Sequence, residues 1–99
     1  MSVLVVMKVP GDTKTFEAFV AANRDLVLEL TEKSKAAGCR GHRFAIGDGC
    51  VVVVDEWETA EQFQGFFSSP DIQAVMGPMG ATGEPEITFA NPKGFPGEF

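Results

Sequence analysis

Residues Gly41–Thr59 have the sequence GHRFAIGDGCVVVVDEWET, and this stretch decides the fold. Four consecutive valines precede the only Trp of the chain, and the only His lies before the turn sequence GDG. Apolar, β-branched runs on both sides of a short Asp-Gly turn are typical of a β-hairpin. The stretch therefore predicts two antiparallel strands, residues 40–47 and 50–57, joined at Asp48-Gly49.

The length of this turn determines which residues face each other. A two-residue type I′ turn at Asp48-Gly49 places His42 opposite Asp55. Its other pairs are Gly47 with Cys50, Phe44 with Val53, and Arg40 with Trp57. Because side chains alternate between the faces of a sheet, one face then carries His42, Phe44, Val53, Asp55 and Trp57. A three-residue loop would shift the register by one and separate His42 from Asp55.

A carboxylate beside His42 has two interpretations. It orients one ring nitrogen and favours the charged ring, which suits a general base. It also fits a cross-strand polar pair at the end of a sheet, worth less than about 1 kcal/mol. Asp55 and Glu56 cannot share one acid-base site, because neighbouring strand residues point to opposite faces.

The remaining elements follow from the spacing of apolar residues. Residues 2–9, SVLVVMKV, form a β-branched run ended by Pro-Gly-Asp and predict a strand. Residues 12–38 have helical spacing, with Asp12 or Thr13 as cap and Gly38 as the end. Thr59 and Gln62 form a capping-box pattern that begins a second helix, and Pro70 suits the first turn of a helical segment after it. Residues 85–90, PEITFA, predict a fourth strand.

The order β-α-β-β-α-β predicts an α+β, ferredoxin-like fold. It consists of a four-stranded antiparallel sheet with two helices on one face. A chain of 99 residues is long enough for one domain. We expect that domain to cover residues 1–91, followed by a Pro/Gly-rich tail over residues 92–99.

Composition excludes several classes of partner. The net charge of −6 speaks against nucleic acid and against anionic membrane surfaces. The apolar run at the N-terminus is too short to span a bilayer and lacks the basic start of a signal peptide. Cys39 and Cys50 have no metal-like spacing and are interpreted as reduced thiols, so we expect a cytoplasmic protein.

The first and third strands are apolar on both faces, at Val3–Met7 and Val51–Val54. Helices can cover only one face of the predicted sheet, and the chain has no further element for the other. A second copy of the same sheet is the expected cover, since two-fold dimers are the commonest assembly. We therefore predict a homodimer; the alternatives are an apolar monomer face and a partner of another kind.

Residues 52–72, VVVDEWETAEQFQGFFSSPDI, together with GCRGHRF at residues 38–44, resemble the antibiotic-biosynthesis monooxygenase-like family. The resemblance extends over about residues 1–91. It implies a dimeric α/β barrel with a small, mostly apolar cavity between sheet and helices in each protomer.

Quinone-forming monooxygenases of this family work without a cofactor on polycyclic phenols. They carry a Trp at the end of the third strand, an Asn four residues earlier and a Tyr on the second strand. Trp57 matches the Trp, whereas Val53 and His42 stand at the other two positions. The resemblance implies oxidation of a small aromatic or quinone-like compound, or a related proton transfer on it. Together with the hairpin register, it suggests His42 as the base, Asp55 as the group that orients it, and Trp57 stacking on the ligand.

The haem-degrading branch of the family uses an Asn on the first strand, a Trp in the second helix and a His late in that helix. Here Val5, Phe66 or Phe67, and Val75 occupy these positions. We therefore expect no haem, no metal and no other cofactor. With Phe44 and Val53, these residues become expected cavity-lining positions.

Asn23 is the last candidate, because it interrupts the apolar stripe of the first predicted helix. Its amide either points into the cavity or bonds a buried backbone carbonyl. Two functions remain open: a cofactor-independent monooxygenase-like enzyme, and a non-catalytic homodimer that binds a small ligand or is purely structural.

Overall fold

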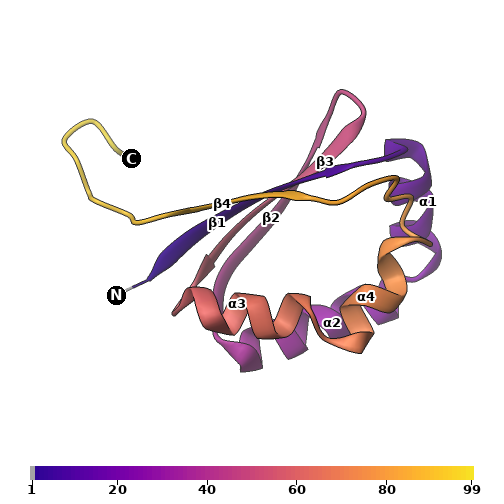
Figure 1. Ribbon diagram of the computed structural model, residues 1–99, viewed down its shortest axis with the longest axis horizontal. Helices are drawn as coiled ribbons and strands as arrows, with labels where there is room; N and C mark the ends of the chain where they lie inside the picture. Colours follow the sequence, from indigo (N-terminus) through magenta and orange to yellow (C-terminus); the bar gives the residue numbers. More distant parts are fainter. Residues whose placement is uncertain (1) are drawn as a thin grey trace.

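The computed structural model describes residues 2–99 and has the predicted ferredoxin-like architecture. Its sheet has the strand order β2-β3-β1-β4, with every neighbouring pair antiparallel. The helices lie on one side of the sheet (Figure 1). The elements are β1 (Val3–Pro10), α1 (Thr13–Ala22), α2 (Arg24–Ala37), β2 (Cys39–Gly47), β3 (Cys50–Trp57), α3 (Ala60–Phe67), α4 (Pro70–Met76) and β4 (Glu86–Ala90).

The long first helix is broken at Asn23, which the apolar spacing did not predict. Asn23 has φ −126° and ψ 40°, outside the helical region. Its backbone N–H and its side-chain amide both donate to the carbonyl of Phe19, at 2.9 and 3.0 Å. An Asn side chain that competes for backbone groups in this way favours the end of a helix. The break separates α1 from α2.

The predicted helix ends are otherwise confirmed. Asp12 caps α1 by accepting from the N–H groups of Lys14 and Thr15, and Gly38 ends α2 with φ 120°. Both hydrogen bonds of the Thr59–Gln62 capping box are present at the start of α3. No described helix is both long and apolar enough to cross a bilayer.

The hairpin has the predicted register next to its turn, with Gly47 opposite Cys50 and His42 opposite Asp55. The turn type was wrong: Gly49 has φ 69°, but no described non-glycine residue has a positive φ, so the turn is not type I′. The pairing of Arg40 with Trp57 was also wrong. A β-bulge at Arg40 places Cys39 opposite Trp57 instead.

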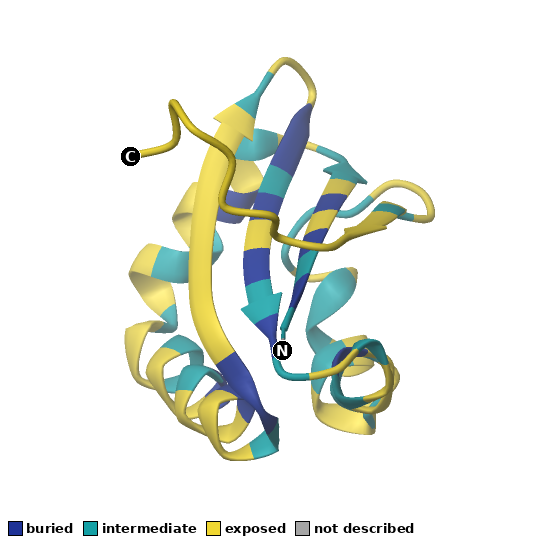
Figure 2. Cartoon of the chain, turned by 90° about the vertical axis from the view of Figure 1, so that its left-hand side faces the viewer, coloured by how far each residue is buried: buried dark blue, intermediate teal, exposed yellow. Residues whose placement is uncertain are grey.

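The core lies between the helices and the sheet. Side chains on the helix-facing side of β1 and β3 are buried at alternate positions, which Figure 2 shows as dark bands. Val5 and Trp57 are each 1% exposed and Phe63 is 3% exposed. Trp57 packs against Phe63, and this contact holds the hairpin against α3.

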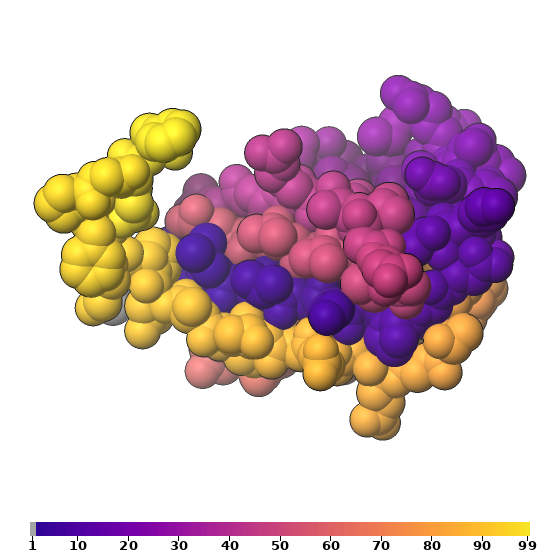
Figure 3. Space-filling model, turned by 90° about the horizontal axis from the view of Figure 1, so that it is seen from above, coloured from indigo at the N-terminus to yellow at the C-terminus, as the bar shows by residue number. Residues whose placement is uncertain are grey.

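The opposite side of the sheet, which we call the open face, carries apolar side chains that no helix covers. Val6 and Val54 lie opposite each other there and are 37% and 39% exposed. Figure 3 looks onto this face, with β1 in indigo. After β4 the chain continues as an extended segment that projects from the domain and carries the exposed rings of Phe95 and Phe99 (Figures 1 and 3).

Candidate functional site

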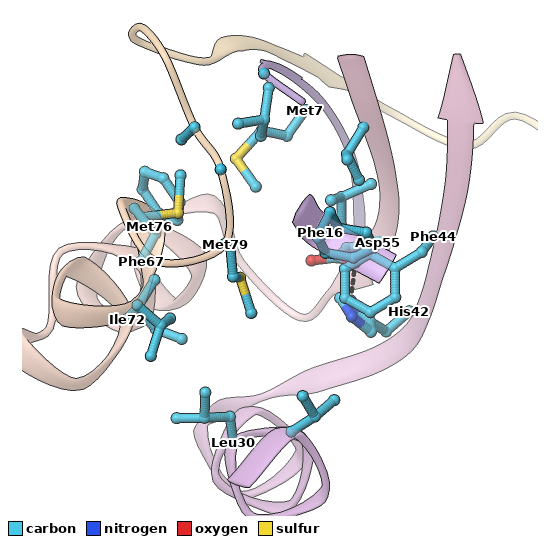
Figure 4. A pocket seen from close by; sticks show the side chains of 18 of the residues that line it. Met7, Phe16, Leu30, His42, Phe44, Asp55, Phe67, Ile72, Met76 and Met79 are labelled. Carbon is cyan, nitrogen blue, oxygen red and sulfur yellow. Dashed lines mark hydrogen bonds and ion pairs between the residues drawn. The ribbon is translucent and has the colours of Figure 1, made fainter. Parts of the chain in front are cut away.

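A cavity of about 130 Å³ lies between the helix-facing side of the sheet and helices α1 to α4. Figure 4 shows His42, Phe44 and Asp55 of the strands together with Phe16 of α1 on one side of the cavity, and Phe67, Ile72, Met76 and Met79 on the other. The helical wall is aromatic, aliphatic and thioether in character. Its members include Phe16, Leu30, Phe63, Phe66, Phe67, Ile72, Val75 and Met76, and Met79 in the turn after α4 adds to it.

Most polar groups of the cavity wall are already engaged. The hydroxyls of Thr31 and Ser34 donate to carbonyls of their own helix, at 2.9 and 2.7 Å. The Asp12 carboxylate caps α1, and the hydroxyl of Thr15 with the N–H of Lys14 lowers the pKa of this carboxyl. His42 and Asp55 remain as the polar pair of the wall.

His42 and Asp55 belong to a short chain of hydrogen bonds on the helix-facing side of the sheet. His42 Nδ1 lies 2.5 Å from Asp55 Oδ1, and Trp57 Nε1 donates to Asp55 Oδ2 at 3.0 Å. The Asp55 side chain is 6% exposed and that of His42 is 29% exposed. Both oxygens of a buried carboxylate therefore have partners, and His42 has a fixed orientation.

The hydrogen bond to Asp55 distinguishes the two nitrogens of His42. An ionised carboxylate only accepts, so in the neutral ring Nδ1 carries the hydrogen and Nε2 carries the lone pair. No residue of the described chain is hydrogen-bonded to Nε2. Because His42 lines the cavity, Nε2 is the nitrogen available to accept a proton from a ligand.

Local sequence explains why these groups meet. Asp55 and Trp57 are two residues apart on β3, so they share a face, and the indole can reach back to the carboxylate. The hairpin register brings His42 across from Asp55. The ring of Phe44 packs edge-on against His42, with centroids 4.5 Å apart. Phe44 in turn contacts Phe16 of α1 at 5.3 Å.

Cys39 lies near this site and behaves as an inert thiol. Burial raises the pKa of the Cys39 thiol, and the nearby Asp55 carboxylate raises it further. The thiol donates to the carbonyl of Gly41 at 3.2 Å. Since the thiolate is the nucleophile of cysteine chemistry, this raised pKa speaks against Cys39 as a reactive group. Within residues 2–99, no cluster of His, Cys, Asp and Glu is arranged to hold a metal ion.

The residues expected at the site divide into two groups. The cavity wall contains His42, Asp55, Phe44, Val53, Phe66, Phe67 and Val75. Trp57, Val5 and Asn23 lie outside it. Trp57 and Val5 are buried in the core, and Asn23 bonds the Phe19 carbonyl at the helix break. Trp57 therefore contacts Asp55 where stacking on a ligand was expected.

Sequence reasoning missed Phe16, Leu30 and Ile72 as wall residues. Each belongs to an apolar helical stripe, and such a stripe predicts burial without distinguishing a cavity wall from a filled core.

Trp57→Phe should lower the free energy of unfolding by about 1.5–3 kcal/mol, the range for a hydrogen bond to a charged group. Phe keeps a ring near Phe63 and Phe66 but leaves Asp55 Oδ2 without its donor. Urea unfolding measures the loss. A double-mutant cycle with Asp55→Asn removes the contribution of ring size, and a coupling energy near zero would show that the indole N–H is unimportant.

Comparison with known proteins agrees with this architecture. Residues 3–77 match the antibiotic biosynthesis monooxygenase family. A monooxygenase from the gene ActVA-Orf6 of Streptomyces coelicolor, solved in complex with the ligand Nanaomycin D, is 20% identical, with 95% of this chain and 89% of that chain covered and a TM-score of 0.67.

Two further solved structures are each 16% identical to the chain. A conserved protein from Methanosarcina mazei has a TM-score of 0.66, with 94% of both chains covered. Rv0793 from Mycobacterium tuberculosis has a TM-score of 0.63, with 97% of this chain and 99% of that chain covered. At this identity the likeness shows the fold, and no curated protein matches the sequence. Because the family match spans most of the chain, from β1 to the end of α4, this protein belongs to the antibiotic biosynthesis monooxygenase family.

Proposed function

We propose that this protein is a cofactor-independent monooxygenase that oxidises a small phenol to a quinone, with His42 as the general base. The main support for this proposal is the position of His42 in the cavity wall, with Nδ1 held by Asp55 and Nε2 free to accept a proton. Asp55 is itself held by Trp57. Membership of a monooxygenase family supports the reaction class.

In the proposed reaction, Nε2 takes the phenol proton and the phenolate transfers an electron to molecular oxygen. The two radicals combine at a ring carbon, and the peroxide takes the proton back from His42. His42 then removes the hydrogen from that carbon as the O–O bond breaks. The hydroxide that leaves takes this proton, so phenol and O₂ yield quinone and water. Asp55 stabilises the imidazolium that forms twice in this cycle.

Oxygen uptake with a panel of phenols and hydroquinones tests the proposal. His42→Gln should lower kcat/KM by about 10²–10⁴-fold, the usual contribution of a general base. Asp55→Asn should lower it less, since His42 stays in place but loses its fixed tautomer. Glu17→Gln, on the exposed side of α1, is the matched control and should keep wild-type activity.

Two results would count against this function. If His42→Gln turned over substrate at the wild-type rate, His42 would not be the general base. A wild-type protein that binds the probes but consumes no oxygen would favour the second candidate, a non-catalytic ligand-binding protein. Val53 favours that candidate. It lines the cavity with an apolar side chain at the position where the resemblance to quinone-forming monooxygenases implies an Asn.

We propose further that two copies associate through the open face, in the cytoplasm. The uncovered side chains of Val6 and Val54 support the association, because apolar groups in the middle of a sheet face gain most from burial. Cys39 and Cys50 are both free thiols, which suits a reducing compartment.

A further inference from the structure

We propose that the cavity selects a neutral, single-ring phenol and rejects fused rings and anions. This inference rests on the proposed function of the His42 site and adds the substrate class. Three observations carry it: the size of the cavity, the absence of cations from its wall, and the position of its polar groups.

The volume of about 130 Å³ limits the ligand to roughly one ring. An apolar cavity of about 150 Å³ holds benzene, whereas pockets for drug-sized molecules measure about 300–1,000 Å³. The helical wall is made of large side chains on three helices, including Leu30, Phe67 and Ile72 (Figure 4). A second fused ring would exceed the volume that these side chains leave between the helices and the sheet.

The charge of the wall excludes an anionic ligand. None of the eight Lys and Arg residues of the chain lines the cavity. The two charged side chains besides His42 are the carboxylates of Asp12 and Asp55. A carboxylate or phosphate buried here would find no Lys or Arg, and the one ring that can become a cation, His42, is already paired with Asp55. Its desolvation would therefore be poorly compensated.

Among the polar groups of the wall, His42 is the one at which we expect a ligand hydroxyl to be recognised. Thr31 and Ser34 have used their hydroxyl hydrogens within α2, and Asp12 caps α1. His42 Nε2 is the acceptor of the wall that makes no hydrogen bond to the described residues and can also take up the proton. Three methionines, Met7, Met76 and Met79, line the cavity. Thioethers make favourable contacts with aromatic rings and adapt to their shape. An aromatic ring can contact these thioethers while its one hydroxyl donates to His42.

Titration of protein labelled with ¹³C in its methionine methyl groups tests the inference directly. The probes are phenol, toluene, 1-naphthol and benzoate. We expect phenol to shift the Met7, Met76 and Met79 signals saturably, with one site per protomer. We expect 1-naphthol to bind at least tenfold more weakly, and benzoate to cause no saturable shift.

The role of His42 is tested by comparing phenol with toluene, which has a similar ring and no hydroxyl. The ratio of their affinities should fall about tenfold in His42→Leu, because that variant keeps the apolar cavity and loses the acceptor. His42→Gln, which retains a carbonyl acceptor, should lose less of the ratio. An unchanged ratio in both variants would show that the hydroxyl does not meet His42.

The outcomes separate this inference from the proposed function. Binding of 1-naphthol as tight as that of phenol, at the same three methionines, would overturn the single-ring limit and leave the oxidation intact. Saturable binding of benzoate would overturn the selection against anions. Phenol binding without oxygen uptake would support the ligand class and overturn the oxidation. No shift of any methionine methyl by any probe would overturn the inference itself.

Discussion

Val54→Asp should convert the proposed homodimer into a monomer, with a dissociation constant raised at least 100-fold. Val54 lies on the open face opposite Val6, in the middle of the sheet. A two-fold axis through this face would bury the new carboxylate of both copies in an apolar interface. Burying an unpaired charge there costs more than the interface can offset.

Sedimentation equilibrium at low micromolar concentration measures this effect. The wild type should have twice the chain mass of 10.6 kDa, and Val54→Asp should have the chain mass itself. Leu28→Asp is the matched control, because Leu28 is 50% exposed on α2, away from the open face. The dimer is refuted if the wild type sediments as a single chain.

Phe63→Ala should remove about 3–5 kcal/mol from the free energy of unfolding, the usual cost of truncating a buried Phe. Phe63 is 3% exposed and contacts the rings of Trp57, Phe67 and Phe89, at centroid distances of 5.7, 5.6 and 5.8 Å. It joins α3 to both β3 and β4. Small domains are stable by only about 5–15 kcal/mol, so the variant loses a large share of its stability.

Thermal and urea unfolding monitored by circular dichroism measure the loss, which corresponds to a melting temperature lower by roughly 10–30 °C. Leu28→Ala removes a similar apolar group from an exposed position and should change stability by no more than about 0.5 kcal/mol. Equal effects of the two substitutions would show that Phe63 does not occupy the core. Binding of phenol to the variant is a second measurement, since Phe63 also lines the cavity.

The fold could be predicted because period-two alternation and capping residues are local signals. His42 and Asp55 were placed together from the turn length alone, and the structure has that pairing. The bulge at Arg40 could not be predicted, because it depends on how Cys39 and Trp57 pack and no single residue type indicates it. Local signals are strong where backbone geometry decides and weak where packing does.

The sequence predicted that a mostly apolar cavity exists, but not which side chains line it, because the lining depends on packing. Alternation places Trp57 on the correct face, but its neighbours Phe63 and Phe66 determine that the indole lies in the core. Asn23 shows the same limit, because its hydrogen bond to Phe19 depends on where the helix breaks. Which apolar helical residues fill space and which border it follows from tertiary packing.

The two ends of β2 differ in how they tolerate insertions and deletions during divergence. If one residue were added between Gly47 and Cys50 and the pairing slipped by one to keep a two-residue turn, every β2 side chain would move to the other face. His42 would then leave the cavity and Arg43 would enter it. At Arg40 one extra residue is already accommodated, and the pairing from Gly41 onward is unaffected. Relatives that keep the His–Asp pair should therefore vary in length at the bulged end of this strand and keep a constant length at the turn.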